Sequence, residues 1–234
     1  MHRQMSRQLG DLLENIKAAV FDFDGTLVDS YKIWAKIDQD LFDQLGLVQP
    51  PNYEKDIAGK RLPEIAKYII EHFQLTSVSQ ERILSCWEES YMKYFSSSVQ
   101  FIDGAAEFLT YLASKSIAIG IATASTHKLV ELFFSNHPEI RALISCVVTS
   151  EDVVHSKPAP DVFLKCLESL GAHPSEGIIF EDSLVGLSAA TKTGSRVVCI
   201  LSHPDDHLEK KELSQLQINS YSEYLYQSRT LEES

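Results

Sequence analysis

The sequence is poor in cysteine and has no long hydrophobic run. Its four cysteines form no CxxC pair and no zinc-ligand spacing, so they predict buried free thiols rather than a disulfide or zinc framework: Cys86, Cys146, Cys166 and Cys199. No apolar stretch approaches the roughly 18 residues that a membrane span requires, and the start of the chain lacks a signal-peptide pattern. We therefore expect a cytoplasmic protein with no membrane partner.

Basic residues are also scarce, with 21 against 33 acidic residues and a net charge of -12. Nucleic acids and anionic membranes are captured by extended basic surfaces, so we expect neither as a partner. The 234 residues are enough for one large α/β domain with a modest insert. Nothing in the sequence requires more than a monomer.

Short apolar runs alternate with amphipathic helical patterns along most of the chain. The runs cover residues 18–23, 117–123, 143–149, 177–180 and 196–201, with a short strand also expected near Ile218. This alternation predicts an α/β fold with a doubly wound parallel sheet that is covered on both faces. Ligands of such sheets bind beyond the carboxyl ends of the strands.

Residues 31–96 interrupt this alternation, because they show only helical periodicity. They predict an all-helical module inserted after the first strand. Aromatic residues at helical spacing predict the internal core of that module: Tyr31, Trp34, Trp87, Tyr91 and Phe95.

Two carboxylates, Asp22 and Asp24, follow the first predicted strand, and Gly25 lets the chain turn at once. The i, i+2 spacing puts both on the same side of the chain. An acidic turn is the simpler interpretation of this pattern alone. Ionised carboxylates at the end of a buried strand are costly, however, unless they bind something cationic.

Two further polar segments follow later strands. Thr123, Ala124 and Ser125 end the second strand, where a hydroxyl and main-chain N–H groups can hold a phosphate or simply cap a helix. Lys157 lies in a loop stiffened by Pro158 and is either a site residue or a solvated lysine.

Glu181 and Asp182 follow the fourth predicted strand. Asp182 can cap the next helix, or the pair can complete with Asp22 an oxygen-rich site for a hard divalent cation, which suits Mg²⁺.

In their order and placement these motifs resemble the haloacid dehalogenase superfamily, in its phosphatase and phosphomutase branch. FDFDGTLVDS, IATAS, SKPAPD and FEDSLVGLSAA carry the resemblance, which extends from Lys17 to about Leu201. It implies a Rossmann-like core, residues 1–29 and 98–234, and an inserted helical cap domain, residues 30–97.

The resemblance also implies roles for the polar residues. Asp22 would be the nucleophile that forms an aspartyl-phosphate, and Asp24 the general acid and base, with its carbonyl on the metal. Thr123, Ala124, Ser125 and Lys157 would bind the phosphoryl group. Asp22, Asp24 and Asp182 would hold Mg²⁺, with Glu181 in direct contact with the metal or behind its ligands.

The segment from Ala58 to Pro63 resembles the specificity loop of the family's cap. Gly59 permits a turn, and Lys60 or Arg61 can reach an anionic substrate or remain solvated surface charges. Trp34 stands where the sugar phosphomutase that this chain resembles has a histidine.

The expected function is therefore a Mg²⁺-dependent phosphatase of a small phosphorylated metabolite. The alternatives are a β-phosphoglucomutase-like sugar phosphomutase and a non-catalytic protein that binds phosphorylated metabolites.

Overall fold

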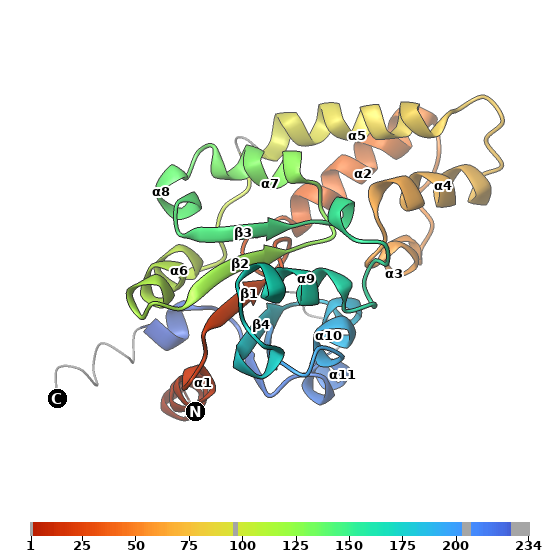
Figure 1. Ribbon diagram of the computed structural model, residues 1–234. Helices are drawn as coiled ribbons and strands as arrows, with labels where there is room; N and C mark the ends of the chain where they lie inside the picture. Colours follow the sequence, from red (N-terminus) through yellow and green to blue (C-terminus); the bar gives the residue numbers. More distant parts are fainter. Residues whose placement is uncertain (1, 96–97, 203–206, 226–234) are drawn as a thin grey trace.

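The computed structural model describes residues 2–95, 98–202 and 207–225, and its centre is a six-stranded parallel sheet (Figure 1). The order across the sheet is β3-β2-β1-β4-β5-β6. This confirms the predicted doubly wound α/β sheet, including the short strand near Ile218. The strands are β1 (Ala18–Phe21), β2 (Ala118–Ala122), β3 (Ile144–Val148), β4 (Gly177–Glu181), β5 (Arg196–Ile200) and β6 (Leu216–Ile218).

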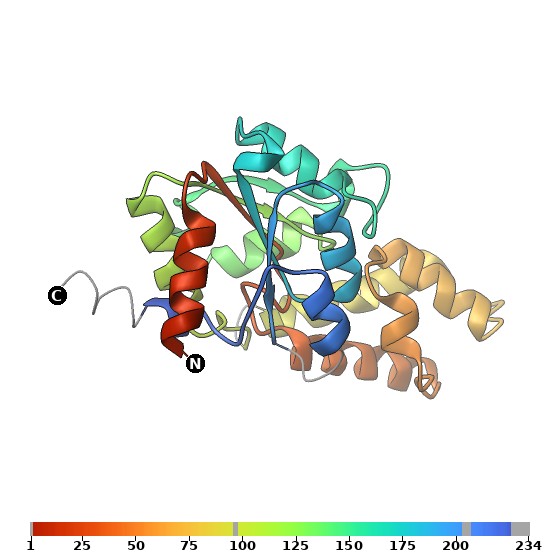
Figure 2. The same ribbon diagram turned by 90° about the horizontal axis from the view of Figure 1, so that it is seen from below.

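Helices cover both faces of this sheet (Figure 2), because successive strand residues point to opposite sides. Phe21 of β1 packs in one hydrophobic core with Phe108 of α6, at 6.3 Å between ring centres. Its neighbour Val20 packs in a second core with Phe163 of α9. The flanking helices are α1 (His2–Leu13), α6 (Ala105–Ser114), α7 (His127–Phe134), α8 (Pro138–Arg141), η1 (Ser150–Asp152), α9 (Asp161–Ser169), η2 (Pro174–Glu176), α10 (Leu184–Thr191) and α11 (His207–Glu212).

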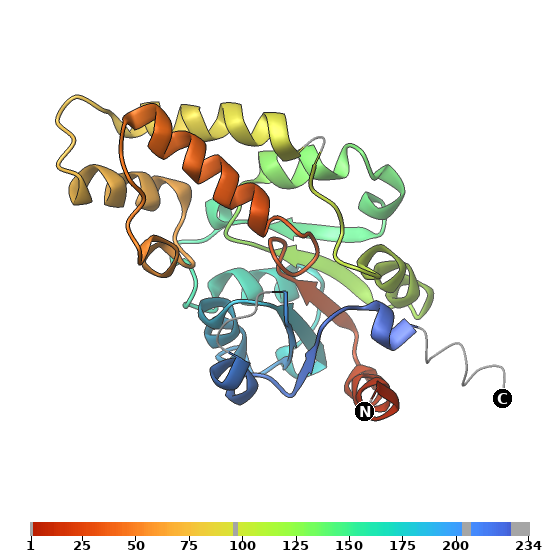
Figure 3. The same ribbon diagram turned by 180° about the vertical axis from the view of Figure 1, so that it is seen from behind.

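Four further helices lie together to one side of the sheet, as Figures 1 and 3 show. We call them the cap helices: α2 (Tyr31–Leu45), α3 (Tyr53–Ile57), α4 (Leu62–His72) and α5 (Gln80–Phe95). Gly46 ends α2 in the left-handed conformation, with φ of 66°. All four fall within the segment that the periodicity predicts to be helical, although α3 is too short to give a periodic signal of its own.

The aromatic core predicted for the cap helices is confirmed in part. Trp87, Tyr91 and Phe95 on α5 are buried. Tyr31 is 45% exposed, so its assignment to the core is wrong. It lies in the first turn of α2, at the end of the helix, where its hydroxyl donates to Glu54 (3.0 Å).

Two chain segments connect the cap helices to the sheet and run side by side. The main-chain N–H of Asp29 donates to the carbonyl of Gln100 (2.9 Å), and Val28 forms an antiparallel bridge with Phe101. The predicted domain boundaries at 29/30 and 97/98 fall near this crossing. The division into two domains stays a prediction, and residues 96 and 97 lie outside the described part of the chain.

The four cysteines are free, and Cys86, Cys166 and Cys199 are buried as predicted. Cys146 is only half-buried because it lies on β3, the strand at one edge of the sheet. Its Sγ lies 3.4 Å from that of Cys166. Among the described residues, no helix is both long and apolar enough to cross a membrane.

Candidate active site

The first acidic loop begins where β1 ends. Asp22 follows Phe21 directly, and its side chain is buried. Gly25 turns the chain with φ of 76°, a conformation that L side chains rarely adopt. A Cβ at this position would lie 2.3 Å from Oδ2 of Asp182, so the glycine also lets a second acidic loop come close.

That second loop begins at the end of β4, the strand paired with β1. Glu181 is buried, and its Oε1 accepts hydrogen bonds from the main-chain N–H of Asp182 (2.9 Å) and Ser183 (3.0 Å). Ser183 caps α10, since its hydroxyl accepts from the N–H of Gly186 (3.0 Å). The alternative that Asp182 caps this helix is wrong. Its carboxylate instead accepts from the hydroxyl of Thr26 (3.3 Å).

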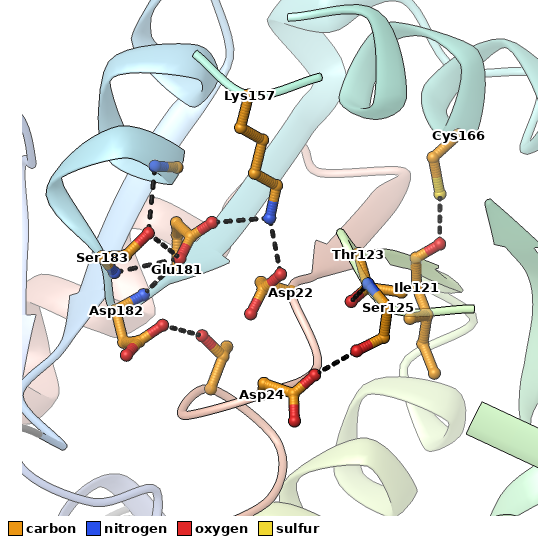
Figure 4. A network of polar contacts seen from close by, with 12 residues as sticks. Asp22, Asp24, Ile121, Thr123, Ser125, Lys157, Cys166, Glu181, Asp182 and Ser183 are labelled. Atoms are coloured by element: carbon orange, nitrogen blue, oxygen red, sulfur yellow. Dashed lines mark hydrogen bonds and ion pairs between the residues drawn. The ribbon is translucent and has the colours of Figure 1, made fainter. Parts of the chain in front are cut away.

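Lys157 reaches the same place from the loop between β3 and α9. Its Nζ lies 2.5 Å from Oδ1 of Asp22 and 2.8 Å from Oε2 of Glu181, and its side chain is 5% exposed. Figure 4 shows the ammonium group between the two carboxylates. The face of Phe163 packs against the ammonium, with the ring centre 4.7 Å away. The alternative of a solvated lysine is therefore wrong.

Loss of solvent and mutual repulsion dominate the electrostatics of these acids. Burial, and after it the charge of Glu181, raises the pKa of Asp22 to about 8. Desolvation and then the charges of Glu181 and Asp22 raise the pKa of Asp182. Desolvation also acts on Glu181, but Lys157 outweighs it and holds the pKa of that carboxyl below its usual range. Lys157 thus pairs with two of the three carboxyl groups, and the charge of Lys210 only partly offsets the shift at Asp182.

The three acids fit a divalent cation. One oxygen from each of Asp22, Glu181 and Asp182 lies within 4.8 Å of the others. With all three ionised, the cluster has more negative than positive charge even with Lys157 included, which is costly away from water unless a cation binds. Oxygen donors alone suit a hard ion such as Mg²⁺. The donor set thus agrees with the metal predicted from the sequence.

Asp24 is held at both carboxylate oxygens. Oδ1 accepts from the hydroxyl of Ser30 (2.7 Å) and from Nε1 of Trp34 (2.8 Å), while Oδ2 accepts from the hydroxyl of Ser125 (2.5 Å). These donors come from the start of α2 and from the loop after β2. The orientation of Asp24 is consequently set by both the cap helices and the sheet.

The segment from Thr123 to Ser125 follows β2 and does not cap the next helix, α7. Thr126 caps α7 by accepting from the N–H of Leu129 (3.4 Å). Thr123 is buried, and its hydroxyl oxygen accepts from the N–H of Ser125 (3.0 Å). That hydroxyl therefore keeps its own hydrogen for another acceptor.

A cavity of about 160 Å³ opens between the cap helices and the carboxyl ends of the strands. Two of the cap residues predicted to bind substrate, Trp34 and Lys60, lie in its wall. Asp24 and Ala124 lie in the wall on the side of the sheet. The remaining wall residues are Asp38, Ile57, Leu62, Ile65, Trp87, Ser125, Thr126 and Leu129.

The other two predicted cap residues lie where the cap helices meet the rest of the chain. Gly59 has φ of 73°, and a Cβ there would lie 2.4 Å from Cγ1 of Val185. The guanidinium of Arg61 donates to Glu64 (3.0 Å) and to the carbonyl of Val154 (3.5 Å). Neither Gly59 nor Arg61 is part of the cavity wall. Their assignment to substrate binding stays a prediction.

The sequence profile of the haloacid dehalogenase-like hydrolases matches residues 19–200, most of the chain. This chain belongs to that family. A probable pseudouridine-5′-phosphatase of Drosophila melanogaster is 27% identical to this hydrolase over 208 residues, which are 87% of this chain and 88% of the relative.

Solved structures share the fold of this hydrolase. A xylulose-(1,5)-bisphosphate complex of CbbY from Rhodobacter sphaeroides superimposes with a TM-score of 0.77 at 21% identity, over 88% of this chain and 94% of that one. A putative β-phosphoglucomutase from Thermotoga maritima gives 0.72 at 21% identity, over 92% and 99%. At this identity the likeness concerns the fold, and it supports a Rossmann-type sheet with a cap.

Sequence analysis of this hydrolase missed two polar residues in the cavity wall: Thr126, which caps α7, and the acid Asp38. A signal for Asp38 exists, because the N-cap residue Ser30 and then Trp34 and Asp38 of α2 follow one another at intervals of four residues and so lie on one side of the helix. Two of the three contact Asp24. The spacing from Ser30 and Trp34 therefore predicts that the carboxylate of Asp38 also lies toward the cavity.

Gly186 of this hydrolase provides a sharp test of the packing behind the acids. A Cβ at this position would lie 1.7 Å from Oε2 of Glu181, the atom that accepts from Lys157. We expect Gly186→Ala to lower the free energy of unfolding by about 1–3 kcal/mol, as overpacking does, and to remove most activity. The measurements are urea unfolding and phosphate release.

The matched control is Gly10→Ala in α1, where a Cβ has no heavy atom within 4 Å. Alanine in a helix interior is favoured over glycine by roughly 0.5–1 kcal/mol, so this variant is expected to be as stable as the parent or more stable. Equal stabilisation by both substitutions would contradict the role given to Gly186.

Proposed function

We propose that the protein is a Mg²⁺-dependent phosphatase that hydrolyses a small phosphorylated metabolite through an aspartyl-phosphate intermediate. The observation that carries this proposal is Asp22, a buried carboxylate paired with Lys157 at the carboxyl end of β1. Asp24, two residues later, lies in the wall of the adjacent cavity. Membership of a hydrolase family and the phosphatase name of the Drosophila relative support it.

Asp22 and Asp24 carry the two chemical steps. An oxygen of Asp22 attacks phosphorus, so that its bond to phosphorus forms while the bond to the leaving alcohol breaks. Protonated Asp24 gives its proton to the departing oxygen. Asp24 then takes a proton from a water molecule whose oxygen attacks the same phosphorus, which releases inorganic phosphate and restores the carboxylate of Asp22.

The phosphoryl oxygens need donors around them during both steps. Lys157 supplies a charged donor, and the hydroxyl of Thr123 has its hydrogen available. The N–H of Ala124 is a further donor, and the hydroxyl of Ser125, which donates to Asp24 here, would reach the phosphoryl group only by turning away from that carboxylate. Fixed donors in a place with little water stabilise the charge that develops on a phosphoryl group.

Asp22, Asp182 and the main-chain carbonyl of Asp24 are the groups that would hold Mg²⁺. The ion would offset the repulsion between the attacking carboxylate and the phosphate. Glu181 is otherwise engaged, since Oε1 accepts from two main-chain N–H groups and Oε2 from Lys157. We therefore assign it to positioning Lys157 rather than to the metal.

Trp34 favours a phosphatase over the β-phosphoglucomutase-like alternative. Its Nε1 donates to Asp24 (2.8 Å), so it orients that carboxylate. An indole N–H is only a donor and cannot pass a proton on as a histidine can. A non-catalytic binding protein is disfavoured too, because three donors fix Asp24, a residue that mere binding of phosphate does not need.

Removal of Mg²⁺ tests the proposed function. We expect phosphate release from a panel of phosphorylated sugars, polyols and nucleotides to fall at least about a hundredfold with chelator and to return with added Mg²⁺. Added NaCl at about 0.2 M should change the rate far less, because Asp22, Lys157 and Glu181 are buried and salt screens buried charges weakly. The measurement is phosphate release, with product analysis on a hexose 1-phosphate.

An isomerised hexose phosphate would establish the phosphomutase instead. Substrate binding without turnover at any Mg²⁺ concentration would establish the binding protein. The monomeric state and the cytoplasmic location stay predictions from the sequence.

A further inference from the structure

Asp38 is a buried carboxylate, 8% exposed, in the wall of the cavity, and the proposed chemistry does not use it. It lies on α2, one helical turn beyond Trp34. Its Oδ1 accepts from Nε1 of Trp87 (3.0 Å) and from the hydroxyl of Tyr53 (3.3 Å). Among the described residues, its other oxygen has no hydrogen-bond donor.

Only the hydroxyl oxygens of Ser156 and Ser195 are both fully buried and unpaired among the described side chains, so this oxygen of Asp38 is open to the cavity and to water. A ligand that displaces the water must supply a donor in its place, because a carboxylate oxygen left without one is unfavourable. Burial raises the pKa of Asp38 to about 6, although Trp87 and Tyr53 act against this. The side chain is therefore mainly ionised at neutral pH and is an acceptor only. A ligand in the cavity can satisfy it with an O–H or N–H group.

The remainder of the cavity wall limits what that ligand can be. Two indoles, Trp34 and Trp87, and several aliphatic side chains make most of the wall on the cap side. Lys60 is the one cation among the described wall residues, and its Nζ donates to the carbonyl of Asp56 (2.7 Å). The volume of about 160 Å³ compares with the roughly 150 Å³ of an apolar cavity that binds benzene.

We propose that Asp38 selects the leaving group, favouring one whose part inside the cavity is uncharged, about one ring in size and carries an O–H or N–H donor, and disfavouring one with a second anionic group there. The inference rests on the proposed phosphatase function and deepens it. A hydroxylated sugar or polyol and a nucleoside base both have this chemistry. A carboxylate or second phosphate at the same place would be repelled by Asp38, because neither anionic group has a hydrogen to donate to the other.

Asp38→Asn is the test variant, because it reverses the polarity offered to the substrate and spares the contacts within the cap helices. The amide oxygen can still accept from Trp87 and Tyr53, which turns the amide N–H₂ toward the cavity. Asp43→Asn is the matched control: it makes the same change on the same helix at an exposed residue outside the wall. Thermal unfolding of both variants checks the fold.

Three substrates separate the effects at pH 7.5 with Mg²⁺: glucitol 6-phosphate, 6-phosphogluconate, which replaces the far CH₂OH with a carboxylate, and phenyl phosphate, which has no donor. We expect the wild type to prefer glucitol 6-phosphate over 6-phosphogluconate by at least about tenfold in kcat/KM. Asp38→Asn should lose about tenfold to hundredfold on glucitol 6-phosphate and gain on 6-phosphogluconate. Phenyl phosphate should change little with either variant.

Uridine 5′-monophosphate and its N3-methyl derivative form a second pair. A wild-type preference for the first assigns an N–H donor, and a preference confined to the glucitol pair assigns an O–H donor.

Equal loss on all substrates, or no change on any, overturns the role given to Asp38 and leaves the phosphatase standing. The role of Asp38 is also overturned if the wild type shows no preference within the glucitol pair and none within the uridine pair, a result that needs no variant. A wild type that releases no phosphate from any of these compounds with Mg²⁺ overturns the proposed function, and this inference with it.

Discussion

Asp22→Asn is expected to stop phosphate release while making the metal-free protein more stable. The amide cannot attack phosphorus as a carboxylate does, so we expect kcat to fall by at least about a thousandfold. The change is nearly isosteric, and Phe21 and the rest of β1 remain packed in the core. The measurements are single-turnover phosphate release and thermal unfolding of the same samples.

The gain in stability follows from the pKa of Asp22, which burial and Glu181 raise to about 8. The unfolded value is near 3.8, so the folded protein binds more protons than the unfolded chain between these two values. Stability of the wild type therefore falls as the pH rises from about 4 to about 8. Asparagine removes this cost, and its advantage in melting temperature should grow over the same pH window.

The control for this prediction is a second Asp-to-Asn variant, measured over the same range of pH. Asp43→Asn removes a charge from an exposed residue and should leave both activity and the pH profile of stability unchanged. Mg²⁺ should narrow the gap between wild type and Asp22→Asn, because a bound cation offsets the carboxylate charge that the variant lacks. Phosphate release from pure Asp22→Asn at near the wild-type rate would exclude the proposed mechanism.

The central cluster was within reach of the sequence because the sheet topology determines it. Parallel strands end at one edge of a sheet, so acids directly after β1 and β4 meet whatever happens elsewhere in the chain. Lys157 follows the same logic, since it lies in the connection that leaves β3 at the same edge and leads to α9. The six predicted strands are all present for a related reason: apolar runs of this length are buried on both faces of the sheet.

Side-chain directions within the cap helices were out of reach, because they depend on how these helices pack. Lys60 and Arg61 are neighbours in sequence, yet one lies in the cavity wall and the other pairs with Glu64. Helical spacing puts Tyr31 with the core residues of α2, but it lies at the helix end and is exposed. The spacing of Asp38 from Trp34 places the two on one face of α2, but the hydrogen bond that Asp38 accepts from Trp87 of α5 depends on how the helices pack.

Lys157→Met is expected to cause the largest loss of stability among the variants considered. Within the described part of the chain, Lys157 is the one cation that forms ion pairs with the buried carboxylates of Asp22 and Glu181. Breaking a buried ion pair from one side typically costs about 3–5 kcal/mol, whereas exposed pairs contribute far less. Burial acts to lower the pKa of Lys157, but the two carboxylates outweigh it and raise the pKa. The titration of Lys157 itself therefore leaves this contribution intact up to its ordinary pKa near 10.5 and removes it only at more alkaline pH.

The pH dependence of the variant separates this account from a simple packing defect. Without the ammonium group, Asp22 and Glu181 have less to offset burial, so the variant should be least stable at neutral to alkaline pH and recover as acid protonates them. Lys165→Met, which changes an exposed lysine on α9, should show neither effect. Adding Asp22→Asn to Lys157→Met removes one unpaired charge, so the double variant should be more stable than Lys157→Met alone. Urea unfolding from pH 5 to 9 measures the stability of each variant. If the free energy of unfolding lost in Lys157→Met is constant across that range, the effect of Lys157 comes from packing against Phe163 rather than from charge.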